Sequence, residues 1–521
     1  MRHATLKWAK ISVLIVVLLL VSALGIRAWY SQRGPGLAVW HTHVPREMTV
    51  REMDASDWNG YMAAESRVFD DVHTNVVEKL DPASRVPLNR YYEGSPLYPE
   101  HFAQNWNRSY VLEPAGKPVG AVVLLHGLTD SPYSLRHIAR RYLDHGFVAI
   151  GIRLPGHGTV PAALTQVDWH DWAAATRLAV REARRRVGPD MPLELVGFSN
   201  GAALALEYSL DAIEDKSLTR PTRLVLISPM IGVTRYARFA GLAGLPAFFP
   251  AFAKAAWLGI VPEFNPFKYN SFPINGARQS YLLTHALQEQ LLRLQRENRL
   301  VDLPPVLTFQ SVIDFTVSVP AVMSALFDQL PENGSEIVLF DVNRSEKFRT
   351  FLSTASYGAL KRLLRTGPQN YRTTVIANAS PDSSKTVERT IEAGEVKERV
   401  RSLGIDYPPD IFSLSHVAIP FPVTDPLYGT SPGTDENFNT NFGTLAPRGE
   451  RGTLIVTLDS MFRIASNPFF PYVAQRIDEG AGKMPGPVIK APVRSHETAE
   501  GATDEPADEL HEVEPEESYE P

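Results

Sequence analysis

A serine between two glycines is the arrangement in this chain with the clearest chemical meaning. Ser199 lies in Gly197-Phe-Ser199-Asn-Gly201, where the apolar run 193–196 gives way to the alanine- and leucine-rich stretch 202–208. A serine on a tight turn between a strand and a helix presents its hydroxyl as a nucleophile, and such a turn leaves little room for flanking side chains. The pattern therefore predicts nucleophilic catalysis by Ser199, with Gly197 and Gly201 required by the turn.

Composition narrows the possible chemistry and the class of protein. The 521 residues are 44% hydrophobic, which is enough for a full α/β core with accessory segments. There is no cysteine, so thiol catalysis, disulfides and cysteine-ligated metals are excluded. Residues 497–521 hold eleven acidic residues and no Lys or Arg, and removing them from the net charge of −6 leaves +5 on the rest. A mildly basic body without a basic stripe predicts no binding to nucleic acid.

The N-terminus carries an uncharged apolar run, residues 11–26. The run is shorter than the roughly 20 residues that a helix needs to span the hydrocarbon of a bilayer. Lys10 and Arg27 bound it, and Trp29 and Tyr30 follow, so its ends carry side chains that suit the membrane interface. These features predict a membrane-inserted helix.

We therefore expect residues 1–36 to be a membrane anchor that contacts the bilayer through residues 11–30. Positive charge before the run favours a cytoplasmic N-terminus, which puts the catalytic domain on the extracytoplasmic side, in the periplasm or at the cell surface. The alternative is a signal peptide, because Ala23-Leu-Gly25 has the small-x-small pattern of a cleavage site. Cleavage there would give a secreted protein.

Short apolar runs alternate with stretches of helical pattern on both sides of the serine. This alternation predicts an α/β fold with a doubly wound, mostly parallel sheet. The runs expected to form its strands are 109–114, 119–125, 147–152, 193–196, 222–229, 305–314 and 337–340.

The turn after the strand at 119–125 reads His126-Gly127-Leu128. In a serine hydrolase with this order of elements, such a turn supplies one half of the oxyanion hole. We expect the backbone N–H groups of Leu128 and Asn200 to be the two donors, with Gly127 allowing the backbone to approach the substrate.

Three segments carry a family resemblance: LLHGLTDSPYSLR at 124–136, RLPGHGT at 153–159 and GFSNG at 197–201. Together they resemble the α/β-hydrolases, and within them the carboxylesterase and monoacylglycerol lipase branch, over about residues 108–480. The resemblance implies a serine esterase that works through an acyl-enzyme, without cofactor or metal. It also implies a catalytic triad in the chain order Ser, Asp, His.

The acid of that triad follows a core strand in this family. Asp314 closes the strand expected at 305–314, and we assign it this role. Asp341, after the strand expected at 337–340, is the competing candidate.

The histidine is found by elimination. Beyond Asp314 the chain has only His416, His496 and His511, and the last two lie in the acidic tail, which has too little apolar content to pack against a site. His416 is therefore expected to move the proton of Ser199. We interpret His126 and His157, in scaffold turns, as structural.

The remaining segments complete the predicted organisation. A cap over the active site is expected at 230–300, rich in Phe, Leu and Trp for acyl chains, with a returning helix at 288–299. Between the second candidate acid and the histidine lies an insertion at about 342–415, in which 373–377 either replaces the strand 337–340 in the sheet or belongs to the insertion. The predicted domains are an N-terminal extension (37–107), the first half of the core (108–229), the cap, the second half of the core (301–480) and a disordered acidic tail (481–521).

The sequence thus predicts a membrane-anchored serine hydrolase that cleaves carboxylic esters of fairly apolar acids, with a small-molecule or lipid ester as its substrate. Two alternatives stay open. The same residues could cleave thioester or amide bonds, or the fold could be a catalytically idle interaction module of the cell envelope.

Overall fold

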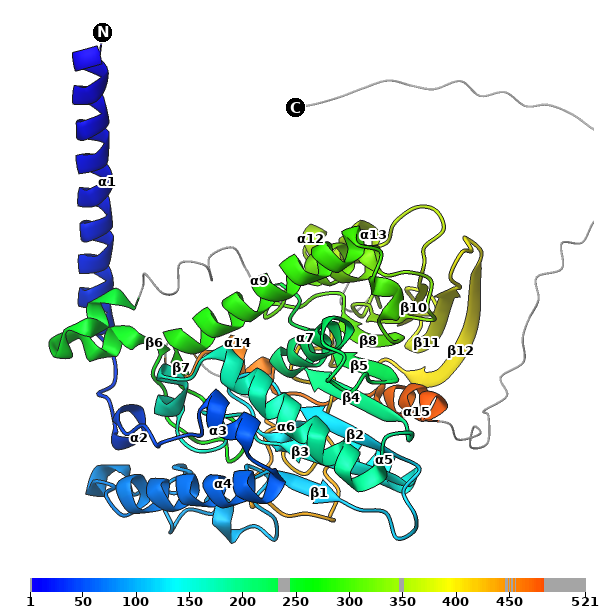
Figure 1. Ribbon diagram of the computed structural model, residues 1–521, viewed down its shortest axis with the longest axis horizontal. Helices are drawn as coiled ribbons and strands as arrows, with labels where there is room; N and C mark the ends of the chain where they lie inside the picture. The colour runs from blue at the N-terminus through cyan, green and yellow to red at the C-terminus, as the bar shows by residue number, and fades with distance from the viewer. Residues whose placement is uncertain are drawn as a thin grey trace, which may run out of the picture.

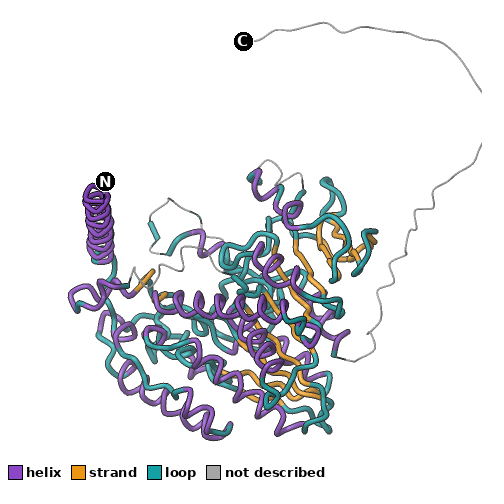
Figure 2. The backbone as a smooth tube through the Cα atoms, turned by 45° about the horizontal axis from the view of Figure 1, so that its top comes forward, coloured by secondary structure: helices purple, strands orange, loops and turns teal. Residues whose placement is uncertain are grey.

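The computed structural model describes residues 2–232, 244–345, 351–445, 448, 450, 453–454 and 456–481. At its centre is a ten-stranded sheet with helices on both faces, and the long helix α1 (Arg2–Ser31) projects from one end of the body (Figure 1). Figure 2 shows the strands gathered in one sheet, with helices around them. The predicted tail, apart from its first residue, lies outside the described residues.

Most strands of the sheet are parallel, in the order β1-β3-β2-β4-β5-β8-β9-β10-β11-β12. Antiparallel pairing occurs only towards the two edges, where β1 pairs with β3, β10 with β11 and β11 with β12. The strands are β1 Tyr110–Leu112, β2 Gly120–Leu125, β3 Phe147–Ile152, β4 Leu193–Phe198, β5 Arg223–Ile227, β8 Val306–Ser311, β9 Glu336–Phe340, β10 Arg372–Asn378, β11 Lys385–Ile391 and β12 Glu398–Asp406.

The central strands are apolar along their whole length because helices cover both faces of the sheet. In β2, Ala121, Val123 and Leu125 belong to one buried cluster, whereas Val122 and Leu124 belong to the other. Successive side chains of a strand point to opposite faces, so one apolar run supplies both halves of the core. The predicted doubly wound, mostly parallel sheet is confirmed.

Long helices pack against the two faces of the sheet. Helices α6 (Trp169–Val187), α7 (Asn200–Glu214) and α9 (Ile274–Arg296) contribute to the first cluster, and α5 (Arg136–Asp144) and α15 (Phe470–Gly480) to the second (Figure 1). The other α-helices are α2 Val39–Thr42, α3 Val50–Ala55, α4 Trp58–Val72, α10 Val319–Ala321, α12 Thr354–Tyr357, α13 Ala359–Leu363 and α14 Leu458–Phe462.

Two sequence expectations are refined by the fold. Helix α9 starts well before the predicted residue 288, because Leu283 and Leu287 pack into the first cluster, a tertiary contact with no local signal. The strand β10 does not replace β9: it pairs with β9 in parallel, and β11 and β12 then extend the sheet. Of the predicted cap, residues 233–243 lie outside the described part of the chain.

Among the described residues, one helix is long and apolar enough to cross a membrane. It comprises Lys10–Ser31, near the N-terminus. The run 11–26 thus belongs to a longer helix than its uncharged length suggested, because helical structure continues through Arg27 to Ser31.

A buried ion pair ties the loop that follows His416 to the start of α5. Arg136 Nη1 donates to Asp425 Oδ2 at 2.9 Å, and both side chains are fully buried. His137 Nε2 and the Tyr133 hydroxyl also bond this carboxylate, at 2.8 and 3.0 Å. Burial, and then the charge of Arg136, lower the pKa of His137 to about 4, so His137 is a neutral donor at pH 7.

Replacing Asp425 by Asn should destabilise the fold strongly, because it removes the fully buried one of the two carboxylates, Asp425 and Glu436, that pair with Arg136. We expect a loss of about 3–5 kcal/mol in the free energy of unfolding, measured by urea denaturation. The matched control is Asp302→Asn, which breaks an exposed pair with Arg220 and should cost less than about 1 kcal/mol. Equal losses in the two variants would contradict this role of Asp425.

Candidate active site

Ser199 occupies a strained turn between β4 and α7. Its backbone has φ 55° and ψ −113°, outside the regions that residues with a side chain usually adopt. A Cβ added to Gly197 would come within 2.4 Å of the Ala202 Cα, and one added to Gly201 within 2.0 Å of the Leu125 carbonyl oxygen. Only glycine fits at either position, which is the steric requirement predicted from the sequence.

The predicted oxyanion donors flank this serine. Gly127 lies so close that a Cβ on it would be 3.3 Å from the Ser199 Cβ. Within the described part of the chain, the N–H groups of Leu128 and Asn200 donate no hydrogen bond. The Asn200 side chain accepts a bond from Ser280 Oγ at 3.2 Å, and its buried amide nitrogen has no partner among those residues. Several donors next to Ser199 are thus free to bind an oxygen atom.

The side chain of His126 stabilises the turn that carries Leu128 through two hydrogen bonds. His126 Nε2 accepts the N–H of Leu154 at 3.0 Å, so Nδ1 carries the proton and donates to the Gly127 carbonyl at 2.9 Å. Burial lowers the pKa of His126 far below its usual value and that of His157 to about 4. Both imidazoles are therefore neutral scaffold groups, in line with the structural role expected for them.

A buried acid, Asp130, and a half-buried amine, Lys268, lie beside the same turn, and neither was predicted. Asp130 is 5% exposed, and the residue after Lys268, Tyr269, donates its N–H to the Thr129 carbonyl at 2.7 Å. Burial raises the pKa of Asp130 against the opposing charge of Lys268, and burial lowers the pKa of Lys268 against the charge of Asp130. Asp130 and Lys268 are far apart in the chain, so only tertiary packing brings the acid and the amine together at this turn.

Asp314 and His416 are brought together from positions far apart in the chain. His416 Nδ1 and Asp314 Oδ2 are 2.7 Å apart, and the two side chains are 5% and 0% exposed. The N–H groups of Thr316 and Val317 donate to Asp314 Oδ1 at 2.7 and 3.0 Å, and Gln310 Nε2 donates to Oδ2 at 3.1 Å. The carboxylate is therefore fixed on both oxygens.

These contacts decide the protonation state of Asp314. Burial alone would raise its pKa, but the charge and hydrogen bond of His416 and the N–H groups of Val317 and Thr316 bring it below its usual value. Asp314 is thus ionised at neutral pH and accepts the His416 Nδ1 proton, which leaves Nε2 as the proton acceptor of that ring.

The competing acid, Asp341, has different partners. Its carboxylate forms an ion pair with Arg344, and its Oδ1 also accepts the N–H of Val342 at 2.9 Å. Its position at the end of β9 satisfied the sequence pattern, but His416 hydrogen-bonds Asp314 instead.

The His416 ring packs against the ring of Phe198, the residue before Ser199, with ring centroids 5.4 Å apart. Arg463 links the loops of the acid and the base, because its carbonyl accepts the Ser415 hydroxyl at 2.7 Å and its guanidinium bonds Thr316 Oγ1. No pattern in the sequence pointed to Arg463, because it comes from a segment remote from both loops.

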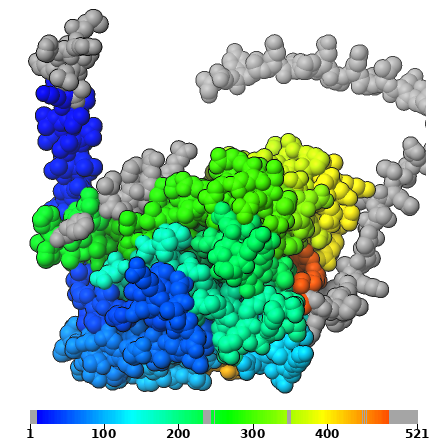
Figure 3. All heavy atoms as spheres, in the orientation of Figure 1, coloured from blue at the N-terminus to red at the C-terminus, as the bar shows by residue number. Residues whose placement is uncertain are grey.

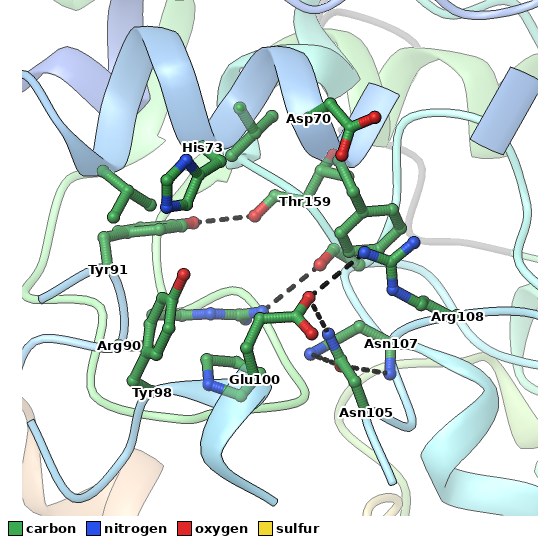
Figure 4. A pocket seen from close by; sticks show the side chains of 15 residues that line it. Asp70, His73, Arg90, Tyr91, Tyr98, Glu100, Asn105, Asn107, Arg108 and Thr159 are labelled. Carbon is green, nitrogen blue, oxygen red and sulfur yellow. Dashed lines mark hydrogen bonds and ion pairs between the residues drawn. The ribbon is translucent and has the colours of Figure 1, made fainter. Parts of the chain in front are cut away.

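Two cavities lie near this region. One, of about 780 Å³, runs beside the acid between residues 312–320 and α13, with Asp314 and Phe315 in its wall. The other, of about 280 Å³, is drawn in Figure 4; the N-terminal extension and Gly158–Thr159 line it, and neither Ser199, Asp314 nor His416 does. In that view Glu100 accepts bonds from Asn105 and Arg108, and Tyr91 donates to the Thr159 carbonyl.

The mostly parallel sheet covered on both faces, with a strained strand-to-helix turn at its centre, is the α/β-hydrolase fold. A family model described as serine aminopeptidase, S33, matches residues 116–340. The thermostable monoacylglycerol lipase of Bacillus sp. (strain H-257) is 34% identical over 89 residues, 17% of this chain and 34% of that protein. The chain thus spans about a third of this curated relative, and the predicted resemblance to the monoacylglycerol lipase branch is confirmed.

Similar solved structures cover less than half of the chain. One comes from work on LipS and LipT, two metagenome-derived lipolytic enzymes. It is 21% identical over 46% of this chain and 88% of its own, with a TM-score of 0.36. Another, a soluble variant of monoglyceride lipase from Saccharomyces cerevisiae, is 15% identical over 44% of this chain and 81% of its own, with a TM-score of 0.34.

The contact between the serine turn and β2 predicts that Gly201→Ala abolishes activity. The new methyl group would overlap the Leu125 carbonyl, so we expect a loss of stability of about 1–3 kcal/mol and displacement of Ser199. Gly116→Ala, at a glycine with open space around it, is the control and should leave both unchanged. Ester hydrolysis and thermal unfolding measure the effect, and an active Gly201→Ala protein would refute the close contact.

Proposed function

We propose that the protein is a membrane-anchored serine hydrolase that cleaves carboxylic esters through an acyl-enzyme. Ser199 is the nucleophile, His416 the acid and base, and Asp314 the carboxylate that orients it. The observation that carries the proposal is the buried 2.7 Å bond between His416 and Asp314, next to a serine on a strained turn. The likeness to a monoacylglycerol lipase supports the ester bond as the target.

The proposed reaction has two steps. Ser199 Oγ attacks the ester carbonyl carbon while its proton passes to His416 Nε2, and His416 then gives this proton to the departing alcohol oxygen. A water molecule, deprotonated by His416, attacks the acyl group, and the proton returns to Ser199 as the carboxylic acid leaves. Asp314 stabilises the imidazolium that forms in each step.

Charge on the carbonyl oxygen must be stabilised as it develops. The unengaged N–H groups of Leu128 and Asn200 are the proposed donors. Fixed donors are effective because they need no reorganisation during the reaction, and each such donor contributes on the order of 10²–10³ in rate.

The apolar helix α1 supports a membrane location. Basic residues before the apolar run favour a cytoplasmic N-terminus, and the catalytic domain would then lie on the extracytoplasmic side. A cleaved signal peptide is the alternative, and the N-terminal sequence of the mature protein distinguishes the two.

A second candidate function is peptide-bond hydrolysis. The family description, serine aminopeptidase, favours it, and the same nucleophile and base could attack an amide. Comparing acyl p-nitrophenyl esters with aminoacyl p-nitroanilides of similar size decides between them, and the proposed esterase should cleave the esters much faster.

Replacing Ser199 by Ala should abolish catalysis and leave the fold intact. Loss of the nucleophile in such a triad costs on the order of 10⁶ in turnover. A labelled fluorophosphonate should modify the wild-type protein and not the variant. An unlabelled wild-type protein would instead favour the idle interaction module, and labelling that persists in the variant would place the nucleophile elsewhere.

Asp314→Asn should slow hydrolysis far more than Asp341→Asn. The first change removes the acceptor of the His416 Nδ1 proton, which costs on the order of 10⁴ in rate, whereas the second acts on a residue paired with Arg344. The comparison of kcat for the two purified variants, each checked for folding by circular dichroism, tests the assignment. The reverse order of effects would overturn it.

A further inference from the structure

The C-terminal end of α1 is part of the cap. Two 3₁₀ segments of the cap, Leu245–Phe248 and Pro250–Ala256, lie at the foot of the helix, where Figure 1 shows them in green on either side of it. The strand β6 (Trp257–Gly259) follows directly. We call residues 245–259 the cap foot.

Four hydrogen bonds join the cap foot to the end of α1 and the residues just after it. Arg27 Nη2 donates to the carbonyls of Trp257, at 2.5 Å, and Ala255, at 3.5 Å. Gln32 Nε2 donates to the Ala251 carbonyl at 3.1 Å, and Lys254 Nζ to the Gly34 carbonyl at 3.2 Å. These bonds fix the cap foot against the last turns of α1.

These contacts also show where the cap foot lies along the axis of α1, relative to the apolar run 11–26. They involve Arg27, which follows the run 11–26 directly, and Gln32 and Gly34, which lie just beyond the end of α1 at Ser31. At a rise of about 1.5 Å per residue, Arg27 to Ser31 covers about 6 Å, similar to the thickness of one polar layer of a bilayer. Trp29 and Tyr30, 58% and 63% exposed, lie at this level.

The cap foot exposes apolar side chains at the same level. Phe249 is 66% exposed, Leu258 52% and Phe252 36%. Trp257, in contrast, is buried, at 3%. Large exposed apolar side chains gathered on one segment mark an interaction surface, and here the surface continues directly from the proposed membrane span.

We propose that the cap foot is a second membrane-contacting element, with Phe249, Phe252 and Leu258 inserted into the boundary between lipid headgroups and acyl chains. The occupant is the bilayer itself, and the inference rests on the proposed span of α1. Helix and cap foot together hold the catalytic domain in one orientation on the membrane.

A short path connects this surface to the nucleophile. Strand β6 pairs with β7 (Phe272–Pro273), which leads directly into α9. Ser280 of α9 donates to the Asn200 side chain, next to Ser199. The membrane contact thus places the wall of the active site at the bilayer surface, where an ester with a long acyl chain resides.

The absence of cysteine permits a direct test on the full-length protein. Phe249→Cys and Leu258→Cys each receive one nitroxide label, and the proteins are reconstituted in vesicles of phosphatidylcholine and phosphatidylglycerol. The control is Leu88→Cys, 65% exposed, in the N-terminal extension. Figures 1 and 3 show most of this extension, with α3 and α4, in blue at the bottom of the view, whereas α1 projects upwards. Collision rates with oxygen and with a water-soluble nickel chelate are measured for each label.

Labels at 249 and 258 should collide mainly with oxygen, which concentrates in lipid, and the label at 88 mainly with the nickel chelate. Equal nickel accessibility at all three positions would overturn the proposal. Spin–spin broadening at 249 that disappears on dilution with unlabelled protein would also overturn it, because a second copy of the chain would then cover the surface.

A kinetic arm tests the consequence for substrate. The double variant F249S/F252S should hydrolyse a long-chain ester presented in vesicles at least about tenfold more slowly, because its membrane contact is weaker. It should hydrolyse soluble p-nitrophenyl butyrate like the wild type. Equal loss on both substrates would contradict the membrane role. The collision measurements need no activity, so they stand even if the proposed esterase function fails.

Discussion

The close approach of the serine turn to the end of β2 is the constraint on which the site depends. Gly201 lies so near the Leu125 carbonyl that no side chain fits, and a Cβ on Gly127 would be 3.3 Å from the Ser199 Cβ, a tight contact. The turn, the oxyanion segment and the first residues of α7 are therefore packed as one unit. Its strain is maintained by the strands on either side, since β4 is hydrogen-bonded to β2 and β5 along its length.

His416, the proposed base, lies much further along the chain from the strand that precedes the serine turn. Between β9 and His416 the chain adds β10, β11 and β12 to the sheet, and no strand immediately precedes the histidine. Its loop is held instead by side chains: Asp425 is bound to Arg136 on one side, and Arg463 bridges Ser415 and Thr316 on the other. Buried charges of this kind add little net stability, but removing one partner is costly, so they restrict the loop to one position.

A hydrolase fold does not determine the bond that is cleaved; the groups around the nucleophile do. In this chain the scaffold histidines are neutral, the acid is ionised, and an acid–amine pair lies beside the oxyanion turn. The cap is joined to the helix that carries the membrane signal. The proposed active site and the proposed membrane contact are therefore joined in one part of the structure, an arrangement that would suit a substrate taken from a membrane surface.

By itself the sequence determined the class of fold and the turn that carries Ser199, and it predicted the oxyanion donors Leu128 and Asn200, because each of these depends on residues close together in the chain. The spacing of Gly197, Ser199 and Gly201 and the apolar strands around them are local signals. The partner of His416, the course of the insertion and the full length of α9 depended on contacts between distant residues. The sequence ranked Asp314 above Asp341 by position, but only the tertiary structure shows which carboxylate meets His416 and that α1 ends on the cap. Such contacts leave no periodicity in the chain, since they are made by side chains that come together only when the sheet is complete.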